Sequence, residues 1–150
     1  ETNTNNPLPK NIKEGEPDRG MILFELPSSQ CISCHKVDGW GGTIGPDLSN
    51  VGKSKSRDQL INAVINPSLE IAPEWQGWFV IDRSGDFHAG RQIDVHEHRA
   101  ELMNFDGGFD NFPDPKAYGV MRNSLMPEGL LNNITPWEFA DLISYLEQLK

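Results

Sequence analysis

Two cysteines and a histidine form the most informative motif in the chain. The segment Cys31-Ile32-Ser33-Cys34-His35 contains both cysteines of the sequence, and its C-x-x-C-H spacing is typical of haem c attachment. Two thiols three positions apart can each add to one vinyl group of a single haem, which brings the adjacent histidine beneath the iron. We therefore expect one covalent haem c on Cys31 and Cys34, with His35 as an iron ligand.

The same cysteine pair admits two other chemistries, because C-x-x-C also occurs in zinc sites and in thioredoxin-like redox sites. A structural zinc site needs four ligands, but the remaining histidines do not lie in a second half-site that contains cysteine. A thioredoxin-like motif follows a strand in a βαβ pattern, whereas a glycine-rich segment follows this motif. The sequence favours haem c over both alternatives.

The second axial position of the iron needs a ligand from elsewhere in the chain, or it stays open. Met126 is the favoured ligand, because Pro127 biases it toward an extended backbone and Gly129 permits a sharp return. Met121 lies nearby but lacks the proline. The other candidates are Met21, Met103, His88, His96 and His98.

The segment after His35 is rich in glycine, which permits tight turns and close approach of the backbone to a large neighbour. We expect three apolar side chains of this segment, Trp40, Ile44 and Leu48, to bury the haem. Such burial raises the midpoint potential of a haem, as does a methionine ligand. A positive midpoint potential is therefore expected.

The net charge of −9 limits the classes of partner. Nucleic acid and anionic lipid would be repelled, whereas a basic patch on another protein would be attracted. No apolar stretch approaches the roughly 20 residues needed to cross a bilayer. The start of the chain lacks both an initiator methionine and a signal sequence, which indicates a processed N-terminus or an excised domain.

Three helices are expected to position these groups. A short helix begins at Pro17 and ends before Pro27, just ahead of the haem motif. A second follows the capping box that starts at Ser56, and Pro67 ends it. The third begins at Thr135, and its apolar residues recur at helical spacing to the end of the chain.

Residues 76–108 have a different pattern, with apolar runs separated by turn residues. We expect a small antiparallel β-meander of three strands here, inserted into one cytochrome domain over residues 17–150. Residues 1–16 are polar and aperiodic, and they are expected to form a flexible N-terminal arm.

The haem motif, the loop at Pro46, the Met126 loop and the last helix occur in the order found in class I cytochromes c, which the chain resembles. The resemblance implies a mainly α fold, with three or more helices around a covalent haem. It also implies that Pro46 packs against the haem and that its carbonyl accepts a hydrogen bond from His35. The first and last helices would meet through Gly20, Phe24, Leu142 and Tyr145.

A narrower resemblance extends over about residues 17–150. Three strings are similar to the Pirellula/Verrucomicrobium-type haem-binding domain, which often ends larger exported proteins, including predicted dehydrogenases with β-propellers. The strings occupy residues 41–48, 65–72 and 124–146.

These observations predict a periplasmic or otherwise exported electron carrier rather than an enzyme. The expected partner is a redox protein with a basic docking patch, such as a fused or associated dehydrogenase. Two alternatives stay open. One is a haem enzyme or gas sensor with a displaceable distal ligand, and the other is a partner-binding module whose haem is structural.

Overall fold

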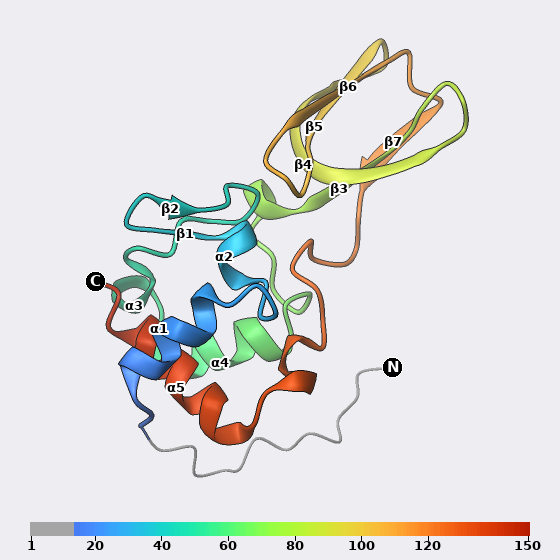
Figure 1. Cartoon of the computed structure of the whole chain (residues 1–150). Helices are drawn as coiled ribbons and strands as arrows, with labels where there is room; N and C mark the ends of the chain where they lie inside the picture. Colours follow the sequence, from blue (N-terminus) through green and yellow to red (C-terminus); the bar gives the residue numbers. More distant parts are fainter. Residues whose placement is uncertain (1–13) are drawn as a thin grey trace.

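The computed structural model describes residues 14–150, and it consists of a helical part and a β-sheet that lie side by side (Figure 1). Most of the expected N-terminal arm, residues 1–13, lies outside the described residues. The helices are α1 (Pro17–Glu25), α2 (Cys31–Cys34), α3 (Val51–Ser54), α4 (Arg57–Ile65) and α5 (Pro136–Glu147), with 3-10 turns η1 (Pro73–Trp75) and η2 (Leu130–Asn133).

The expected capping boxes are present at two helix starts. The Ser56 hydroxyl accepts a bond from the backbone N–H of Gln59, whose side chain accepts one from the N–H of Ser56. Thr135 and Glu138 form the same reciprocal pair ahead of α5. Each pair satisfies backbone donors that a helix leaves without partners at its N-terminus.

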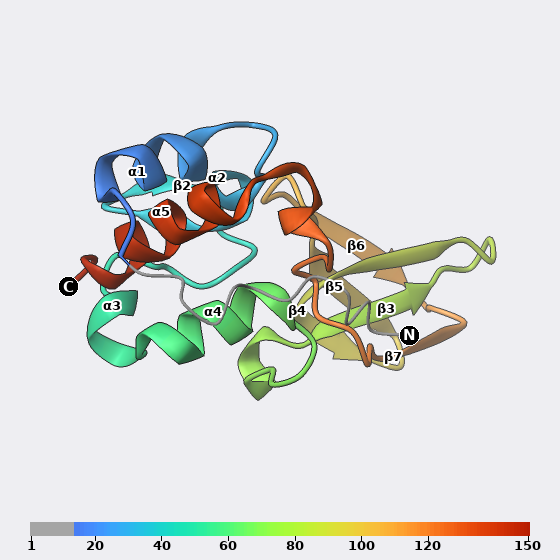
Figure 2. The same ribbon diagram turned by 90° about the horizontal axis from the view of Figure 1, so that it is seen from below.

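Helices α1 and α5 lie against each other in both views (Figures 1 and 2). Phe24 of α1 is 2% exposed, and its ring centroid lies 5.7 Å from that of Tyr145 in α5. Gly20 lies at the contact, where a Cβ atom would be 2.7 Å from the Cβ of Tyr145 and would overlap the backbone carbonyl of Asp141. The helices therefore approach closely only because Gly20 has no side chain.

Asp141 of α5 anchors the start of α1. One of its carboxylate oxygens accepts a hydrogen bond from the backbone N–H of Glu16 at 2.6 Å, and the other lies 3.1 Å from Nε of Arg19. The Asp141 residue is only 6% exposed. The carboxylate thus binds the N-terminal turn of one helix to the middle of another.

Replacing Asp141 by alanine should lower the free energy of unfolding by about 1.5–3 kcal/mol, the cost typical of losing hydrogen bonds to a charged group. Asp141→Asn is the matched control, because it keeps an acceptor for Glu16 while removing the charge. Denaturant unfolding of the two variants would rank them, with asparagine closer to wild type. Wild-type stability in the alanine variant would contradict this account of the anchor.

The larger sheet has five antiparallel strands in the order β6-β5-β4-β3-β7. Strand β7 returns across the sheet and pairs with β3, with Val80 opposite Tyr118. The strands are β3 (Gly77–Ile81), β4 (Phe87–His96), β5 (Arg99–Met103), β6 (Phe109–Pro113) and β7 (Ala117–Val120), and a separate hairpin contains β1 (Lys36–Val37) and β2 (Trp40–Gly41).

The sheet has its own small core. Val80, Ala100 and Leu102 are almost fully buried on one of its faces. The rings of His88 in β4 and Phe112 in β6 lie 4.3 Å apart, although β5 lies between these strands. The sheet is therefore strongly curved.

The expected mainly α fold class is wrong. The described residues are about 33% helical and 24% in strands, with a five-stranded antiparallel sheet. The sheet also continues to Val120 instead of ending near residue 108. The two additional strands are short and mostly exposed, so they lack the apolar alternation from which strands are predicted.

Over residues 14–150, no helix is long and apolar enough to cross a lipid bilayer.

Candidate functional site

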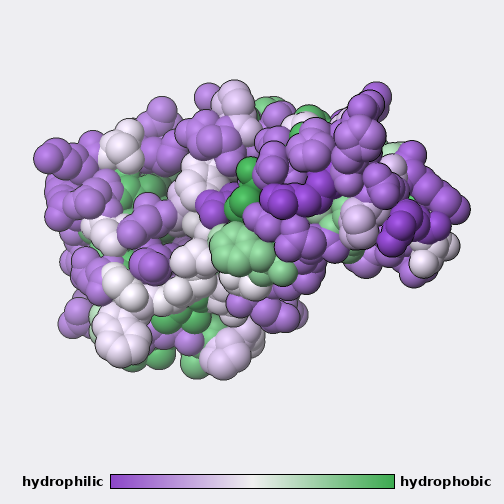
Figure 3. Space-filling view, turned by 90° about the horizontal axis from the view of Figure 1, so that it is seen from above, coloured by the Kyte–Doolittle hydropathy of each residue, from purple (hydrophilic) through white to green (hydrophobic). Residues whose placement is uncertain are grey.

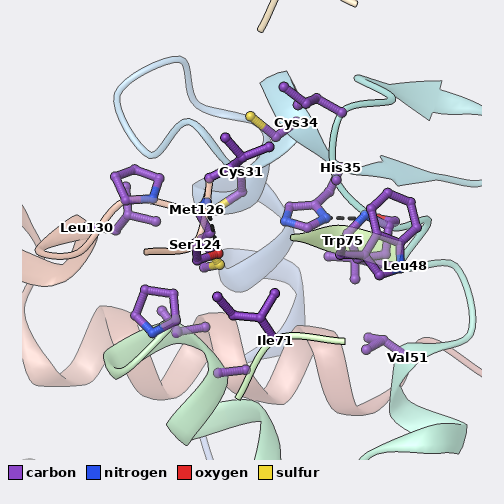
Figure 4. Close-up of a pocket in the computed structure, with 18 of the residues that line it drawn as sticks. Cys31, Cys34, His35, Leu48, Val51, Ile71, Trp75, Ser124, Met126 and Leu130 are labelled. Carbon is purple, nitrogen blue, oxygen red and sulfur yellow. Dashed lines mark hydrogen bonds between the residues drawn. The ribbon is translucent and has the colours of Figure 1, made fainter. Parts of the chain in front are cut away.

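A cavity of about 280 Å³ lies in the helical part of the molecule, beneath the haem motif. Its wall is mostly apolar, and Cys31, Cys34 and His35 all line it together with Met126. Figure 4 shows these side chains around the cavity, with Val51 and Ile71 on its other sides. Two thiols and an imidazole in an apolar wall are the groups that attach and ligate a haem c, and a thioether can supply a second iron ligand.

Helix α2 presents the two cysteines one turn apart. His35 is its C-cap, with an extended backbone, so the chain leaves the helix there and the imidazole extends toward the cavity (Figure 4). Burial raises the pKa of both thiols. Among the described residues, no three His, Cys, Asp or Glu side chains cluster in a way that could hold a metal ion.

The imidazole of His35 is held in one tautomer. Its Nδ1 lies 2.8 Å from the carbonyl oxygen of Pro46, and because a carbonyl only accepts, Nδ1 carries the proton. Burial lowers the pKa of His35, and the bond to Pro46 partly offsets this effect. The ring is therefore neutral at physiological pH, with the lone pair of Nε2 free to bind iron.

The loop that carries Pro46 packs tightly against the haem motif. The backbone N–H groups of Gly42, Gly45 and Leu48 donate to the carbonyls of Ile32, Cys34 and Lys36, each at 2.8 Å. A Cβ atom on Gly45 would lie 2.7 Å from Cε1 of His35. A glycine at this position therefore lets the loop reach the imidazole and bring the Pro46 carbonyl to Nδ1.

Met126 is held at the cavity by a chain of serine hydrogen bonds. The backbone N–H of Met126 donates to the hydroxyl of Ser124 at 3.1 Å. The N–H of Ser124 in turn donates to the hydroxyl of Ser68, just after α4, at 3.0 Å. The loop is thus fixed by a residue far away in the sequence, and Pro127 follows the methionine in the cavity wall.

The structure brings together most, but not all, of the expected cofactor-binding residues. Ile44, Pro46 and Leu48 line the cavity, but Trp40 does not. The side chain of Trp40 is 80% exposed in β2, which forms a hairpin with β1. Trp40 is therefore not among the expected residues that the structure brings to the cavity.

The other candidate iron ligands do not line the cavity. His88 pairs with Asp82 on the sheet, with Nε2 and Oδ2 2.8 Å apart, and the side chain of His98 contacts Glu97. The thioether of Met103 accepts a hydrogen bond from Thr43. Met126 is thus the candidate sixth ligand that shares a cavity with His35.

Several residues of the cavity wall are not among the cofactor-binding residues expected from the sequence. They come from α4, from the segment that follows it and from the sheet, and none belongs to the haem motif or to the methionine loop. Among them are Leu60, Val64, Pro67, Ile71, Trp75 and Phe105.

A match to a protein-family model agrees with this chemistry. Residues 18–80 match the sequence model of the family described as Cytochrome c, a region that contains the haem motif and Pro46 and covers less than half of the chain. No curated protein matches the chain. Among solved structures the chain is similar to "Crystal structure of SoxXA from P. pantotrophus", with a TM-score of 0.46 and 16% identity over 92% of this chain and 84% of that chain.

The family match assigns the cofactor. The chain carries covalently bound haem c with its iron, as the C-x-x-C-H motif predicts, and the match supports a haem-based electron-transfer cytochrome.

Proposed function

We propose that this protein is a single-electron carrier in which His35 and Met126 ligate the iron of one haem c. The observation that carries the proposal is the shared cavity, which brings a tautomerically fixed imidazole and an anchored methionine to the same apolar space. The bound haem supplies a reversible change between ferric and ferrous iron. The residues around the cavity bind the haem, hold its two axial ligands in place and exclude water from it.

The cavity residues favour electron transfer over catalysis. With both axial ligands supplied by the chain, no coordination position is left for a substrate. Glu70 is the one carboxylate and His35 the one imidazole among the described residues that line the cavity. Because His35 is engaged by Pro46, the described residues of the wall lack the acid–base pair that peroxide chemistry needs.

The net charge of this chain indicates the kind of partner that it binds. A net charge of −9 favours a redox protein with a basic docking patch, since complementary charge accelerates encounter. We infer that this partner is an exported dehydrogenase, fused or associated, and that the chain works in the periplasm. The strings shared with the Pirellula/Verrucomicrobium-type domain support this inference, and also the assignment of residues 17–150 to one domain.

Absorption spectroscopy of the purified holoprotein tests the proposal. We expect the oxidised form to show the weak near-infrared band that reports methionine-sulfur ligation. The reduced form should not change its spectrum when carbon monoxide is added at neutral pH, because Met126 occupies the sixth position. A carbon monoxide adduct would instead identify an enzyme or sensor with a displaceable ligand.

A further inference from the structure

The sheet contributes an aromatic side chain to the haem cavity. Phe105 lies in the turn between β5 and β6, and it is the one residue of the five strands and the turns between them that lines the cavity. Its side chain is 48% exposed, so it stands at the edge of the cavity rather than deep inside it. Figure 3 shows apolar residues gathered where the helical part meets the sheet, whereas the far end of the sheet is hydrophilic.

The turn that carries Phe105 is stiffened by Asn104. The side-chain oxygen of Asn104 accepts hydrogen bonds from the backbone N–H groups of Asp106 and Gly108, each at 3.0 Å. Its side-chain nitrogen donates to the carboxylate of Asp110 at 3.2 Å. Such bonding restricts the backbone on both sides of Phe105.

The turn is also attached to the loop that contacts His35. The hydroxyl of Thr43, next to Ile44 in the cavity wall, donates to the sulfur of Met103 at the end of β5, at 3.6 Å. A Cβ atom on Gly107 would lie 3.4 Å from the same hydroxyl. The sheet is therefore docked on the haem loop at the point from which Phe105 reaches the cavity.

From this arrangement we propose that Phe105 is a cofactor-contacting residue, by which the inserted sheet closes the edge of the haem cavity to water and small solutes and raises the midpoint potential. The inference rests on the proposed electron-transfer function, and it gives the inserted sheet a role in that function. A hydrophobic shell controls both solvent access and local dielectric around a metal centre, and lower polarity disfavours the more highly charged ferric state. Phe105 acts at this edge of the shell.

Comparison of Phe105→Ala with Phe109→Ala tests the proposal in the holoprotein. Phe109 is the matched control because it lies in the same hairpin, is 58% exposed and does not line the cavity. Neither substitution changes the charge of the protein. We expect Phe105→Ala alone to lower the midpoint potential and to increase several-fold the rate constant for oxidation of the reduced protein by ferricyanide, since a lower potential and a more open edge both favour that reaction.

A third variant, Phe105→Leu, should keep most of the wild-type potential, because leucine retains much of the apolar cover. Equal potentials and ferricyanide oxidation rates in Phe105→Ala and Phe109→Ala, with the methionine band present in both, would overturn the role of Phe105. Absence of that band in the wild-type protein would instead contradict the proposed ligation. The two failures are therefore distinguishable.

Discussion

Replacing Met126 by alanine is expected to remove the near-infrared methionine band of the oxidised protein and to lower its midpoint potential on the order of 0.1 V, within the ~0.8 V range over which axial ligands tune haem. The physical reason is that a thioether binds ferrous iron in preference to ferric iron, so its loss favours oxidation. The open position should then bind carbon monoxide in the reduced state. Spectroelectrochemistry and a carbon monoxide titration measure these effects.

Met121→Ala is the matched control for this experiment. Met121 lies five positions upstream, near Gly77 at the base of the sheet, and it does not line the cavity. Its variant should keep both the band and the wild-type potential. Loss of the band in Met121→Ala but not in Met126→Ala would identify Met121, not Met126, as the sixth ligand. Retention of the band in both variants would refute methionine ligation by either residue.

The second large effect is expected at the crossing of α1 and α5. Gly20→Ala should destabilise the protein by about 2–3 kcal/mol, the upper range for an added methyl group in a packed site, because the new Cβ would overlap the Asp141 carbonyl. At an exposed helical position the same change would stabilise by about 1 kcal/mol. The sign of the effect therefore identifies the close crossing.

Thermal unfolding of the holoprotein measures this prediction, with a fall in Tm of roughly 2–4 °C for each kcal/mol at a chain length of this order. Ile22→Ala is a suitable control, since Ile22 lies in the same helix and is 57% exposed. It should change the stability by no more than about 0.5 kcal/mol. If Gly20→Ala were as stable as the wild-type protein or more stable, the close crossing of α1 and α5 at Gly20 would be contradicted.

Much of the helical part could be read from local patterns. The capping boxes at Ser56 and Thr135 predict helix starts, because the donors and acceptors they satisfy lie within four residues of one another. The C-x-x-C-H motif predicts the attachment chemistry for the same reason, since one turn of helix carries all its reactive atoms. The Pro46 carbonyl came from the family resemblance, and its hydrogen bond to His35 is present.

The sheet shows where local patterns are insufficient. Strands β6 and β7 are mostly exposed, so their positions are determined by pairing with β5 and β3 rather than by apolar alternation. Trp40 is expected from the sequence to bury the haem, whereas its side chain is 80% exposed in the hairpin formed by β1 and β2. The pairing of these strands rests on hydrogen bonds between backbones, which side-chain patterns indicate only weakly.

By itself, the sequence determined the chemistry of this protein: two thiols and a histidine in one short segment, a methionine before a proline, and the helices that follow from their caps. Only the tertiary structure decided which distant residues complete the site. Ser68 holds the methionine loop through its hydrogen bond with Ser124. Phe105 lines the cavity from a sheet whose outer strands, β6 and β7, are not predicted by the sequence. Such contacts join segments far apart in the chain, and they form only when the whole fold brings those segments together.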